Sequence, residues 1–453
     1  MSSIEEIRSE RLKKVEALKE KGIDSFVPNT NRTISIDAYL GDFSAYLENQ
    51  NVETLVGRIT AFRSHGSSAF IDINDGTTKV QVFLKKDQIG EIAFSDFEQF
   101  IDSGDFIEIS GVAFLTKTGQ NSVLAHTWRL LTKSLVPVPD AWFGIKDEEE
   151  RFRRRYLDIL LNPEVRAIVE KRSLFWNTIR TYLLEKKFIE VETPVLETIT
   201  GGADARPFIT HHNALDIDVY LRISAGELWQ KKLLVSGIPR TFEIGRIFRN
   251  EGMSNEHLQD YTQLEYYMAY ADFYQGMEMT KELYQLIADK VFGTRQFTIK
   301  GHQVDFDADW VVYDFCEEIK KAFGVDPLET SIEEVKAALQ KAEIEFDPKG
   351  FNIERGVDLL WKKIRKQIAG PGFLVGVPVY LEPLAKRSRE DARKVERFQV
   401  LLAGSEMGKG FSELNDPIDQ RQRFEHQQAL RDAGDDEAQM ADMESVEALE
   451  YGL

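Results

Sequence analysis

The stretch that decides the fold consists of two predicted strands, Phe242-Glu243-Ile244-Gly245-Arg246-Ile247-Phe248-Arg249-Asn250-Glu251 and Tyr261-Thr262-Gln263-Leu264-Glu265-Tyr266-Tyr267. Because side chains alternate between the two faces of a strand, most apolar residues of the first strand share one face, and Gly245, Arg249 and Glu251 share the other. Glu265 and Tyr267 follow the same period on the second strand. The pattern predicts a hairpin with one face in the core and a site for a charged ligand on the other.

Length and composition restrict the class of protein. A chain of 453 residues is too long for one core and predicts two or three domains. No apolar run approaches the roughly 18 to 20 residues that a membrane span needs, and the N-terminus is charged. The single cysteine, Cys316, excludes an internal disulfide framework and a cysteine-rich zinc site. These features predict a cytoplasmic protein with no membrane partner.

The net charge of -19 argues against a general nucleic-acid binder, because the overall field repels phosphate. A polyanionic partner would have to meet local basic patches. The candidates are Arg151, Arg153, Arg154 and Arg155 in one patch, and Lys386, Arg387, Arg389, Arg393, Lys394 and Arg397 in another. Charge alone favours the alternative that each patch is a solvated face.

Residues 51–135 contain several short segments in which apolar and polar residues alternate, as they do in β-strands. The predicted strands are 52–62, 69–74, 79–84, 106–114 and 122–131, with glycines between them. Short strands with such turns are typical of a small barrel, and the leading prediction is an OB-fold. Residues 1–50 are expected to form a helical extension, beginning with an amphipathic helix that ends at Gly22.

Phe70 is an aromatic residue on the polar face of a predicted barrel strand. It could serve as a stacking platform for an unpaired base, with hydrogen bonds supplied by Arg63, Gln81 and Gln120. The alternative is an aromatic side chain covered by a neighbouring loop. The residue pattern by itself leaves both interpretations open.

The rest of the chain mixes helices and strands. Residues 136–160 are expected to be a linker, with Pro137, Pro139 and Gly144 at its start, and residues 161–453 a further domain. A segment at about 293–368 is expected to be an insertion without recognisable chemistry. A strand at 395–402 is expected to lead into a glycine-rich turn that contains Gly404, Gly408 and Gly410.

Several separated strings resemble one family in its order. They are Arg155-Tyr156-Leu157-Asp158, Val191-Glu192-Thr193-Pro194, Gly201-Gly202-Ala203, Ala205-Arg206-Pro207-Phe208-Ile209-Thr210-His211-His212-Asn213, Phe248-Arg249-Asn250-Glu251 and Gly410-Phe411-Ser412-Glu413-Leu414-Asn415-Asp416. Together they resemble the class II aminoacyl-tRNA synthetases, and within that class the lysyl-tRNA synthetases. The resemblance implies an α+β chain, in which an OB-fold barrel precedes a catalytic domain with an antiparallel sheet and flanking helices.

The resemblance also implies partners. A homodimer would form through the segment that ends at Pro194, and the barrel would read the anticodon of tRNA(Lys). Arg63, Phe70 and Gln81 stand at the positions that the family uses for this purpose. Gln120 stands where the family commonly has a glutamate, so the resemblance supports its contact less well.

By resemblance, the catalytic domain would join lysine to ATP and then transfer the lysyl group to tRNA, with Mg²⁺ as the metal. The reaction needs orientation and charge neutralisation rather than a protein nucleophile. Arg249 would bridge the lysine carboxylate and the α-phosphate, and Glu251 would accept from adenine. His257 would lie near the phosphates, and Tyr261 would stack on adenine where the family usually has phenylalanine.

The pocket for the amino acid is acidic in this sequence. An aspartate pocket would need an arginine at its end, whereas the predicted strands offer carboxylates instead. By resemblance, Glu413 and Tyr267 would hold the ε-ammonium, Glu227 and Gly202 the α-amino group, and Phe411 the substrate's stem; Glu265 completes the set. The alternative for Glu265 and Glu413 is a surface carboxylate in a salt bridge.

The sequence departs from the family at several positions. Glu406 matches one metal carboxylate, but Gln399 stands at the position of the other, and a neutral amide is a weaker Mg²⁺ ligand. Lys409 replaces a usual asparagine beside the substrate, and the loop string His257-Leu258-Gln259-Asp260-Tyr261 also differs. We therefore expect a divergent member of the family.

The sequence ends at Glu450-Tyr451-Gly452-Leu453, a string that leads directly into motif 3 in the resembling family. We expect it to be part of a longer, complete enzyme. The alternatives are a non-catalytic tRNA-binding or regulatory protein and a relative of the aspartyl- and asparaginyl-tRNA synthetases. Lysylation of a protein instead of tRNA is disfavoured by the attached barrel.

Overall fold

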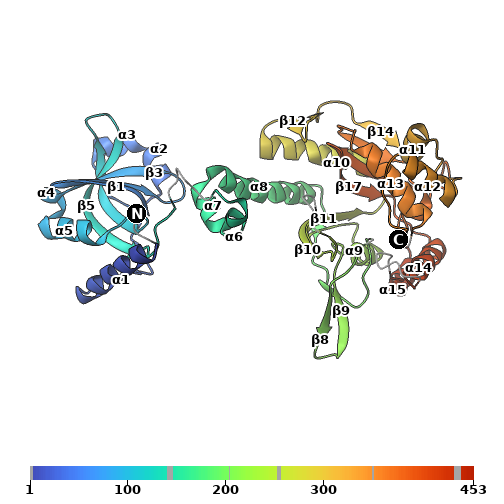
Figure 1. The fold of residues 1–453 in the computed structure, drawn as a ribbon, viewed down its shortest axis with the longest axis horizontal. Coiled ribbons are helices and arrows are strands. Elements are labelled where there is room, and N and C mark those ends of the chain that lie inside the picture. The colour runs from blue at the N-terminus through green and yellow to red at the C-terminus, as the bar shows by residue number, and fades with distance from the viewer. Residues whose placement is uncertain (1–3, 140–145, 204, 253–256, 349–350, 433–439) are drawn as a thin grey trace. The chain divides into compact units, whose positions relative to one another are not determined.

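The computed structural model describes residues 4–139, 146–203, 205–252, 257–348, 351–432 and 440–453. The chain divides into two compact units, Met1–Arg166 and Ala167–Leu453 (Figure 1). Among the helices of the described residues, none combines the length and apolar character that crossing a membrane requires. The expected boundaries within residues 136–160 stay a prediction, and Gly144 lies outside the described residues.

The first unit contains a closed five-stranded barrel, as the OB-fold prediction required. Its strands are β1 (Glu53–His65), β2 (Ser68–Asn74), β3 (Lys79–Lys85), β4 (Phe106–Leu115) and β5 (Asn121–Thr132), in the order β1-β2-β3-β5-β4. Along β2, Ile71 and Ile73 are buried while Phe70 and Asp72 are only half-buried, so the predicted alternation is confirmed. A Cβ at Gly111 would lie 2.2 Å from the carbonyl oxygen of Leu124, which explains the glycine at this irregular point of β4.

Helices surround this barrel. They are α1 (Ile4–Glu20), α2 (Ile36–Gly41), α3 (Phe43–Asn49), α4 (Lys86–Ile89) and α5 (Glu91–Phe100). The core joins barrel residues with Leu18 of α1, Ile36 and Tyr39 of α2 and Phe97 of α5. The predicted first helix is confirmed, and the segment before the barrel packs on it.

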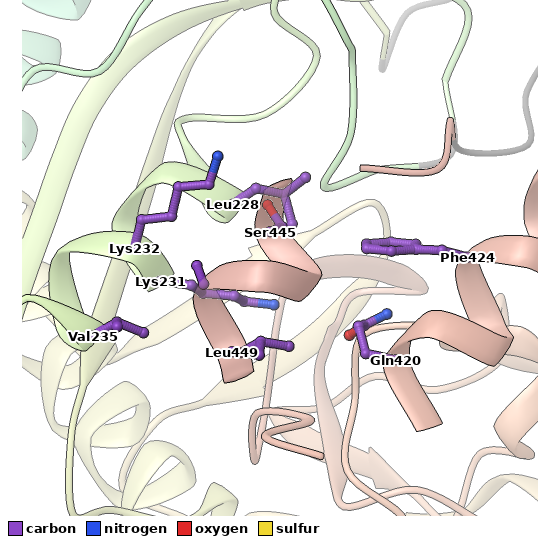
Figure 2. Close-up of a pocket in the computed structure, with 9 residues that line it drawn as sticks. Leu228, Lys231, Lys232, Val235, Gln420, Phe424, Ser445 and Leu449 are labelled. Atoms are coloured by element: carbon purple, nitrogen blue, oxygen red, sulfur yellow. The ribbon is translucent and has the colours of Figure 1, made fainter. Parts of the chain in front are cut away.

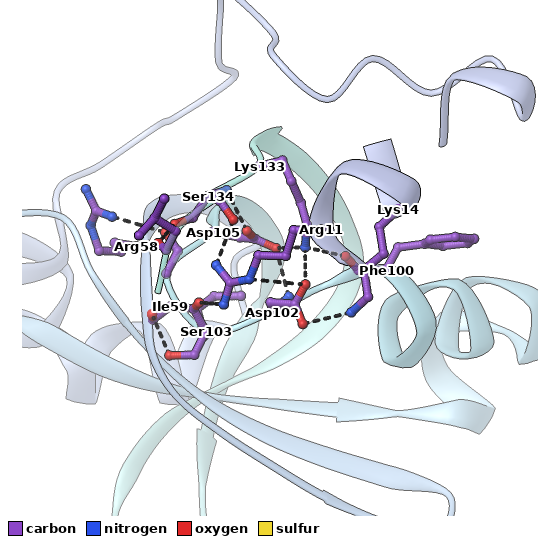
Figure 3. Close-up of polar contacts among 12 residues, drawn as sticks. Arg11, Lys14, Arg58, Ile59, Phe100, Asp102, Ser103, Asp105, Lys133 and Ser134 are labelled. Carbon is purple, nitrogen blue, oxygen red and sulfur yellow. Dashed lines mark hydrogen bonds and ion pairs between the residues drawn. The ribbon is translucent and has the colours of Figure 1, made fainter. Parts of the chain in front are cut away.

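A buried polar network also ties α1 to the barrel (Figure 3). The ammonium of Lys133 is fully buried, lies 2.7 Å from Asp105 Oδ2 and also pairs with Asp102. Arg11 of α1 donates from Nη1 to the carbonyl oxygen of Ser134 at 2.7 Å. Buried charges persist only when they are paired and hydrogen-bonded. The inner side of the predicted amphipathic helix therefore carries the buried Arg11 as well as the apolar Leu18.

The second unit is built around several small sheets. One has the order β11 (Asp260–Met268), β10 (Arg240–Phe248), β6 (Ile189–Glu190), and another has the order β14 (Val311–Asp314), β15 (Gly372–Val375), β16 (Arg397–Leu402), β17 (Ser405–Phe411). The others are β7 (Leu196–Glu197), β9 (Ile217–Leu221), β8 (Ile209–His212), and the pair β12 (Gln296–Ile299), β13 (His302–Asp305). Antiparallel pairs dominate as expected, and β6–β10 and β14–β15 are short parallel pairs.

The predicted hairpin is the antiparallel pair β10–β11. Glu243 lies opposite Glu265, and Phe242 lies opposite Tyr266. Phe242 and Tyr266 pack in an apolar cluster with Leu183 of α8 (Pro163–Glu185). The hairpin therefore has one core face and one polar face, which confirms the alternation read from the sequence.

The first unit also contains α6 (Glu148–Arg153) and α7 (Arg155–Leu161). The other helices of the second unit are α9 (Glu227–Val235), α10 (Phe273–Ile287), α11 (Phe315–Phe323), α12 (Ile332–Lys341), α13 (Ile353–Arg365), α14 (Pro417–Asp432) and α15 (Met443–Glu450). Helix α15 packs against α9 and α14 (Figure 1). Helix α15 is therefore in contact with α9, the helix that carries Glu227.

Two parts of the second unit differ from what the sequence suggested. The segment 293–368, expected as an insertion, contributes β14 to the four-stranded sheet and helices α11, α12 and α13 to a common core. The predicted turn is confirmed at Gly404, which lies between β16 and β17, but it is wrong for Gly408 and Gly410, because both belong to β17. A Cβ at Gly410 would lie 2.6 Å from the ring of Phe398, so this glycine permits close strand packing instead of a turn.

Candidate functional site

The polar face of the hairpin carries a hydrogen-bonded carboxylate. Glu265 Oε1 accepts from the backbone N–H of Ala225 at 2.8 Å and from Nε2 of Gln263 at 2.7 Å. The hydroxyl of Tyr267 donates to Glu265 Oε2 at 3.3 Å. Burial, and then the charge of Glu227, raise the pKa of Glu265 to about 8. The arrangement fixes an acceptor inside the protein, where a positively charged ligand would favour its ionised form.

The start of α9 brings a second carboxylate to the same place. Glu227 is the first residue of α9 and is buried. A Cβ at Gly202 would lie 2.8 Å from Cβ of Glu227 and 2.6 Å from Oγ of Ser224, and the φ of Gly202 is +85°. Only glycine fits this close approach without strain. Gly202 and Glu227 are therefore adjacent, as the sequence analysis required of a shared site.

Lys231 joins the third carboxylate to this group. Its Nζ lies 2.6 Å from Glu413 Oε2 and 3.4 Å from Glu227 Oε1. The same Nζ lies 5.5 Å from the ring centroid of Phe411. Burial raises the pKa of Glu413 to about 7, although the charge of Lys231 lowers it. Glu413 thus does form an ion pair, as the open alternative proposed, but this pair lies inside the acidic cluster.

A buried ion pair lies next to the acidic cluster, because Glu243 is the cross-strand neighbour of Glu265. Arg222 Nη1 lies 2.5 Å from Glu243 Oε1, and both side chains are almost fully buried. Glu243 Oε2 also accepts from the backbone N–H and the hydroxyl of Thr193, at 3.0 and 2.6 Å. A Cβ at Gly245 would lie 2.1 Å from Arg222 Nη2. Gly245 therefore leaves space for the guanidinium group that links the hairpin to the segment around Thr193.

The predicted ATP residues lie at the end of the hairpin where the loop connects β10 to β11, and within that loop. Arg249 donates from its backbone N–H to the carbonyl oxygen of Gln259 at 2.7 Å, and its guanidinium carbon lies 5.8 Å from the ring centroid of Tyr261. Glu251 and His257 are exposed. Residues 253–256 of the connecting loop lie outside the described residues. The structure therefore brings Arg249 and Tyr261 together and leaves the other two at the surface.

The two predicted metal residues have protein partners of their own. The amide oxygen of Gln399 accepts from the guanidinium of Arg397. Glu406 Oε1 accepts from Nε1 of Trp361 at 2.7 Å. Across the described ranges, there is no group of three or more His, Cys, Asp or Glu side chains that could hold a metal ion. Both predicted metal residues therefore accept a hydrogen bond from another side chain of the protein.

Lys409 is directed toward a buried carboxylate. Its Nζ lies 3.3 Å from Glu382 Oε2, and Arg397 Nε lies 2.7 Å from Glu382 Oε1. The Nζ of Lys409 also lies 6.0 Å from the ring centroid of Phe411. Lys409 therefore shares the single negative charge of Glu382 with Arg397.

A small cavity lies behind α9 (Figure 2). Its lining residues are Leu228, Lys231, Lys232, Val235, Gln420, Phe424, Ser445, Ala448 and Leu449, and its volume is about 10 Å³. A space of this size holds at most one water molecule. It is therefore a packing defect between α9, α14 and α15 and too small for an amino acid.

The barrel presents a stack of aromatic rings. The rings of Phe70 and Phe83 are parallel within 15°, with centroids 4.4 Å apart. The rings of Phe83 and Phe114 follow at 5.6 Å and 22°. Phe70 is half-buried and packs on a ring of the adjacent strand. This arrangement favours the platform interpretation over an aromatic that a loop covers.

Of the polar residues predicted to lie around Phe70, Arg63 and Gln81 lie on the neighbouring strands, and Gln120 lies outside the strands. Arg63 pairs with Phe70 across β1 and β2, and its Nη2 lies 3.6 Å from Asp72 Oδ1. Gln81 lies opposite Asp72 on β3, and its amide oxygen accepts from the hydroxyl of Ser122 at 3.1 Å. Gln120 is exposed in the turn before β5.

Sequence reasoning missed Lys231, Gln263 and the buried Arg222–Glu243 pair. Lys231 follows Glu227 by four residues, a spacing that places both on one face of a helix and would have indicated the contact. Gln263 shares the period of Glu265, but its hydrogen bond depends on the rotamer. For Arg222, the sequence contains no signal that links it to Glu243.

Comparison with known proteins covers nearly the whole chain. Residues 147–453 match the family described as tRNA synthetases class II (D, K and N), and residues 53–131 match the OB-fold nucleic acid binding domain. A lysine–tRNA ligase from Thermosipho melanesiensis is 40% identical, covering 99% of this chain and 90% of the relative. One from Moorella thermoacetica is 42% identical, covering 98% and 90%. With a class II signature over most of its length and these relatives over nearly all of it, the chain belongs to the lysine–tRNA ligase family of class II tRNA synthetases.

Proposed function

We propose that this chain attaches lysine to tRNA(Lys) in an ATP-dependent reaction that proceeds through lysyl-adenylate. The observation that carries the proposal is the cluster of Glu227, Glu265 and Glu413 beside Tyr267, on the polar side of the hairpin. Three carboxylates in a partly buried site favour a ligand with more than one positive charge. Lysine carries two ammonium groups, whereas aspartate and asparagine place no cation on the side chain.

Within this site, Arg249 is proposed to orient the first step. The lysine carboxylate attacks the α-phosphorus of ATP, a new P–O bond forms, and the bond to pyrophosphate breaks. The planar guanidinium of Arg249 can donate to the carboxylate and to the α-phosphate at once, which lowers their mutual repulsion. Tyr261, beside Arg249, is proposed to stack on adenine, with Glu251 as acceptor and His257 near the phosphates.

The second step transfers the lysyl group. A hydroxyl at the end of the tRNA attacks the lysyl carbonyl carbon, the bond to AMP breaks, and AMP leaves. The acidic cluster is proposed to hold the two ammonium groups throughout, with Phe411 along the substrate's stem. The chain's contribution to both steps is orientation and electrostatic stabilisation.

Mg²⁺ is proposed to accompany ATP. The donor set fits an ion that is held mainly by phosphate oxygens and takes one protein carboxylate, Glu406, because Mg²⁺ commonly uses one or two carboxylates with substrate phosphates. The amide oxygen of Gln399 is less suitable, since a neutral amide is a weaker Mg²⁺ ligand than a carboxylate. When bound, the ion would neutralise charge on the phosphates.

The barrel is proposed to bind the anticodon through Phe70, with Arg63 and Gln81 beside it and Gln120 at the edge. Replacing Phe70 with alanine should weaken tRNA binding by about 1 to 3 kcal/mol, because one stacked base is lost. The measurement is equilibrium binding of tRNA(Lys), with Ile92→Ala as control, since Ile92 is 78% exposed elsewhere in the same unit. Equal affinity of the Phe70→Ala variant and the wild type would contradict the platform.

The homodimer and the cytoplasmic location stay predictions. The exposed apolar side chains include Ile168, Val169, Leu174, Leu184, Ile189, Val195 and Leu196. They belong to α8 and the segment around Pro194, which the resemblance assigns to contact with a second copy of the chain. Such side chains are typical of an interface.

The decisive experiment is amino-acid-dependent exchange of labelled pyrophosphate into ATP. We expect exchange with lysine and background rates with aspartate and asparagine. Exchange with aspartate or asparagine instead would overturn the substrate assignment. Binding of tRNA(Lys) without exchange for any amino acid would support the alternative of a non-catalytic tRNA-binding protein.

A further inference from the structure

Lys231 places a positive charge of the protein itself inside the acidic cluster. Its Nζ contacts Glu413 Oε2 at 2.6 Å and Glu227 Oε1 at 3.4 Å, and lies 5.5 Å from the ring centroid of Phe411. These three residues are assigned to lysine under the proposed function. Figure 2 shows the side chain extending from α9 toward the side of α15. A resident ammonium group thus shares the environment meant for the substrate.

The charge balance of the cluster depends on this residue. When they are ionised, Glu227, Glu265 and Glu413 carry three negative charges, and Lys231 leaves two of them uncompensated. Lysine brings two ammonium groups, while its carboxylate is assigned to Arg249. With Lys231 present, the cluster and the substrate's ammonium groups are therefore matched in charge.

Lys231 does not have to leave when the substrate arrives. It approaches Oε2 of Glu413. An ionised carboxylate has about four acceptor sites on its two oxygens, so a second ammonium group can bind to the same side chain. Lys231 and the substrate's ammonium group therefore need not compete for Glu413. The geometry is more consistent with Lys231 orienting the carboxylate to which the substrate binds.

We propose that Lys231 is a positioning residue, which holds Glu413 ionised and oriented beside Phe411 before the substrate binds and so keeps lysine binding stronger at low pH than it would be without this charge. This inference rests on the proposed function, because the pocket is assigned to lysine there. It goes further by giving a role to a residue that touches the carboxylates instead of the reacting atoms.

The pH dependence follows from the groups around Glu413. These groups are Lys231 and Glu227 of α9, Glu265 and Tyr267 of β11, and Lys409 of β17. Burial raises the pKa of Glu413 to about 7, and the charge of Lys231 is the main influence that lowers it. Below that pH the carboxyl group is neutral and binds an ammonium group poorly. Without Lys231 the pKa rises further, and binding requires a higher pH.

The test is calorimetric titration of the full chain with lysine between about pH 6 and pH 9, where Glu413 changes its charge. For Lys231→Met we expect weaker binding below pH 7, by about tenfold for each unit by which the pKa of Glu413 rises. The difference from the wild type should shrink toward pH 9. Lys231→Arg should restore the wild-type pH profile, because it keeps the charge.

Lys232→Met is the matched control, since Lys232 is the neighbour on α9 and pairs with Glu444 at 3.5 Å, outside the cluster. It should leave the profile unchanged. If Lys231→Met does not fold, Lys231→Gln tests the same charge. In a Glu413→Gln background, removing the charge of Lys231 should cause no further shift of the pH profile.

The possible outcomes separate this inference from the proposed function. A Lys231→Met variant whose affinity follows the wild-type pH profile, at the same or a uniformly lower level, would show a packing role and overturn the inference. Tighter binding with an unchanged profile would show competition and also overturn it. A wild type that binds no lysine at any pH would contradict the proposed function itself.

Discussion

Replacing Arg249 with alanine is expected to slow lysyl-adenylate formation by roughly 10² to 10⁴, while the fold is retained. Two charge-assisted hydrogen bonds, to the lysine carboxylate and the α-phosphate, contribute about 1.5 to 3 kcal/mol each, and each 1.36 kcal/mol corresponds to a factor of ten in rate. The side chain is half-buried and lies over Tyr261, so its loss leaves the core clusters of the hairpin intact. Lysine-dependent pyrophosphate exchange measures the effect.

Two variants make this result specific. Arg246→Ala removes an exposed arginine of the same strand, which pairs with Asp260, and should leave the exchange rate within about twofold, because exposed pairs contribute little. Arg249→Lys keeps the charge but cannot bridge two anions with a planar group, so it should restore only part of the rate. An Arg249→Ala variant that is as fast as Arg246→Ala would remove Arg249 from the proposed mechanism.

Replacing Glu243 with alanine is expected to lower the local stability of the hairpin by about 3 to 5 kcal/mol, because it leaves the buried guanidinium of Arg222 without its counter-charge. Both side chains are almost fully buried, and Glu243 also accepts from Thr193. The free energy of opening, obtained from amide hydrogen exchange of β10 and β11, gives the change in the second unit without assuming that both units unfold together.

The control for this prediction is an ion pair of the same kind at the surface. Arg180 Nε lies 2.9 Å from Glu190 Oε2, and both side chains are about one-third exposed. Glu190→Ala should therefore change the opening free energy by less than about 1 kcal/mol. Similar losses for Glu190→Ala and Glu243→Ala would mean that the buried pair does not hold the hairpin to the segment around Thr193.

The sequence predicts the parts of this protein whose signal is local and periodic. The hairpin and the barrel strands follow from alternation, and Ile71 and Phe242 lie on the faces that alternation assigned to them. Gly408 and Gly410 misled the prediction, because both lie in β17. At Gly410, a glycine that permits close packing against Phe398 has the same local appearance as a glycine in a turn.

The polar contacts of the site were less predictable, since they join residues far apart in the chain. The ion pair between Lys231 and Glu413 joins α9 to the segment that follows β17. The pair between Arg222 and Glu243 joins the residue that follows β9 to β10 of the hairpin. Alternation places a carboxylate on a face but does not say which cation reaches it. For the same reason, the sequence did not predict the hydrogen bond from Trp361 to Glu406, because Trp361 belongs to the segment 293–368, which was expected to be an insertion.

Under the proposed role of Phe70 as a stacking platform, the ring stack of the barrel has a thermodynamic consequence for RNA binding. One face of Phe70 is already covered by Phe83, which in turn rests on Phe114, so the platform is ordered before a nucleotide arrives. Little side-chain entropy then remains to be lost on binding, and the ordering cost falls on the RNA. An anticodon loop that already holds its bases unstacked would bind with a smaller entropic penalty than a flexible strand of the same sequence.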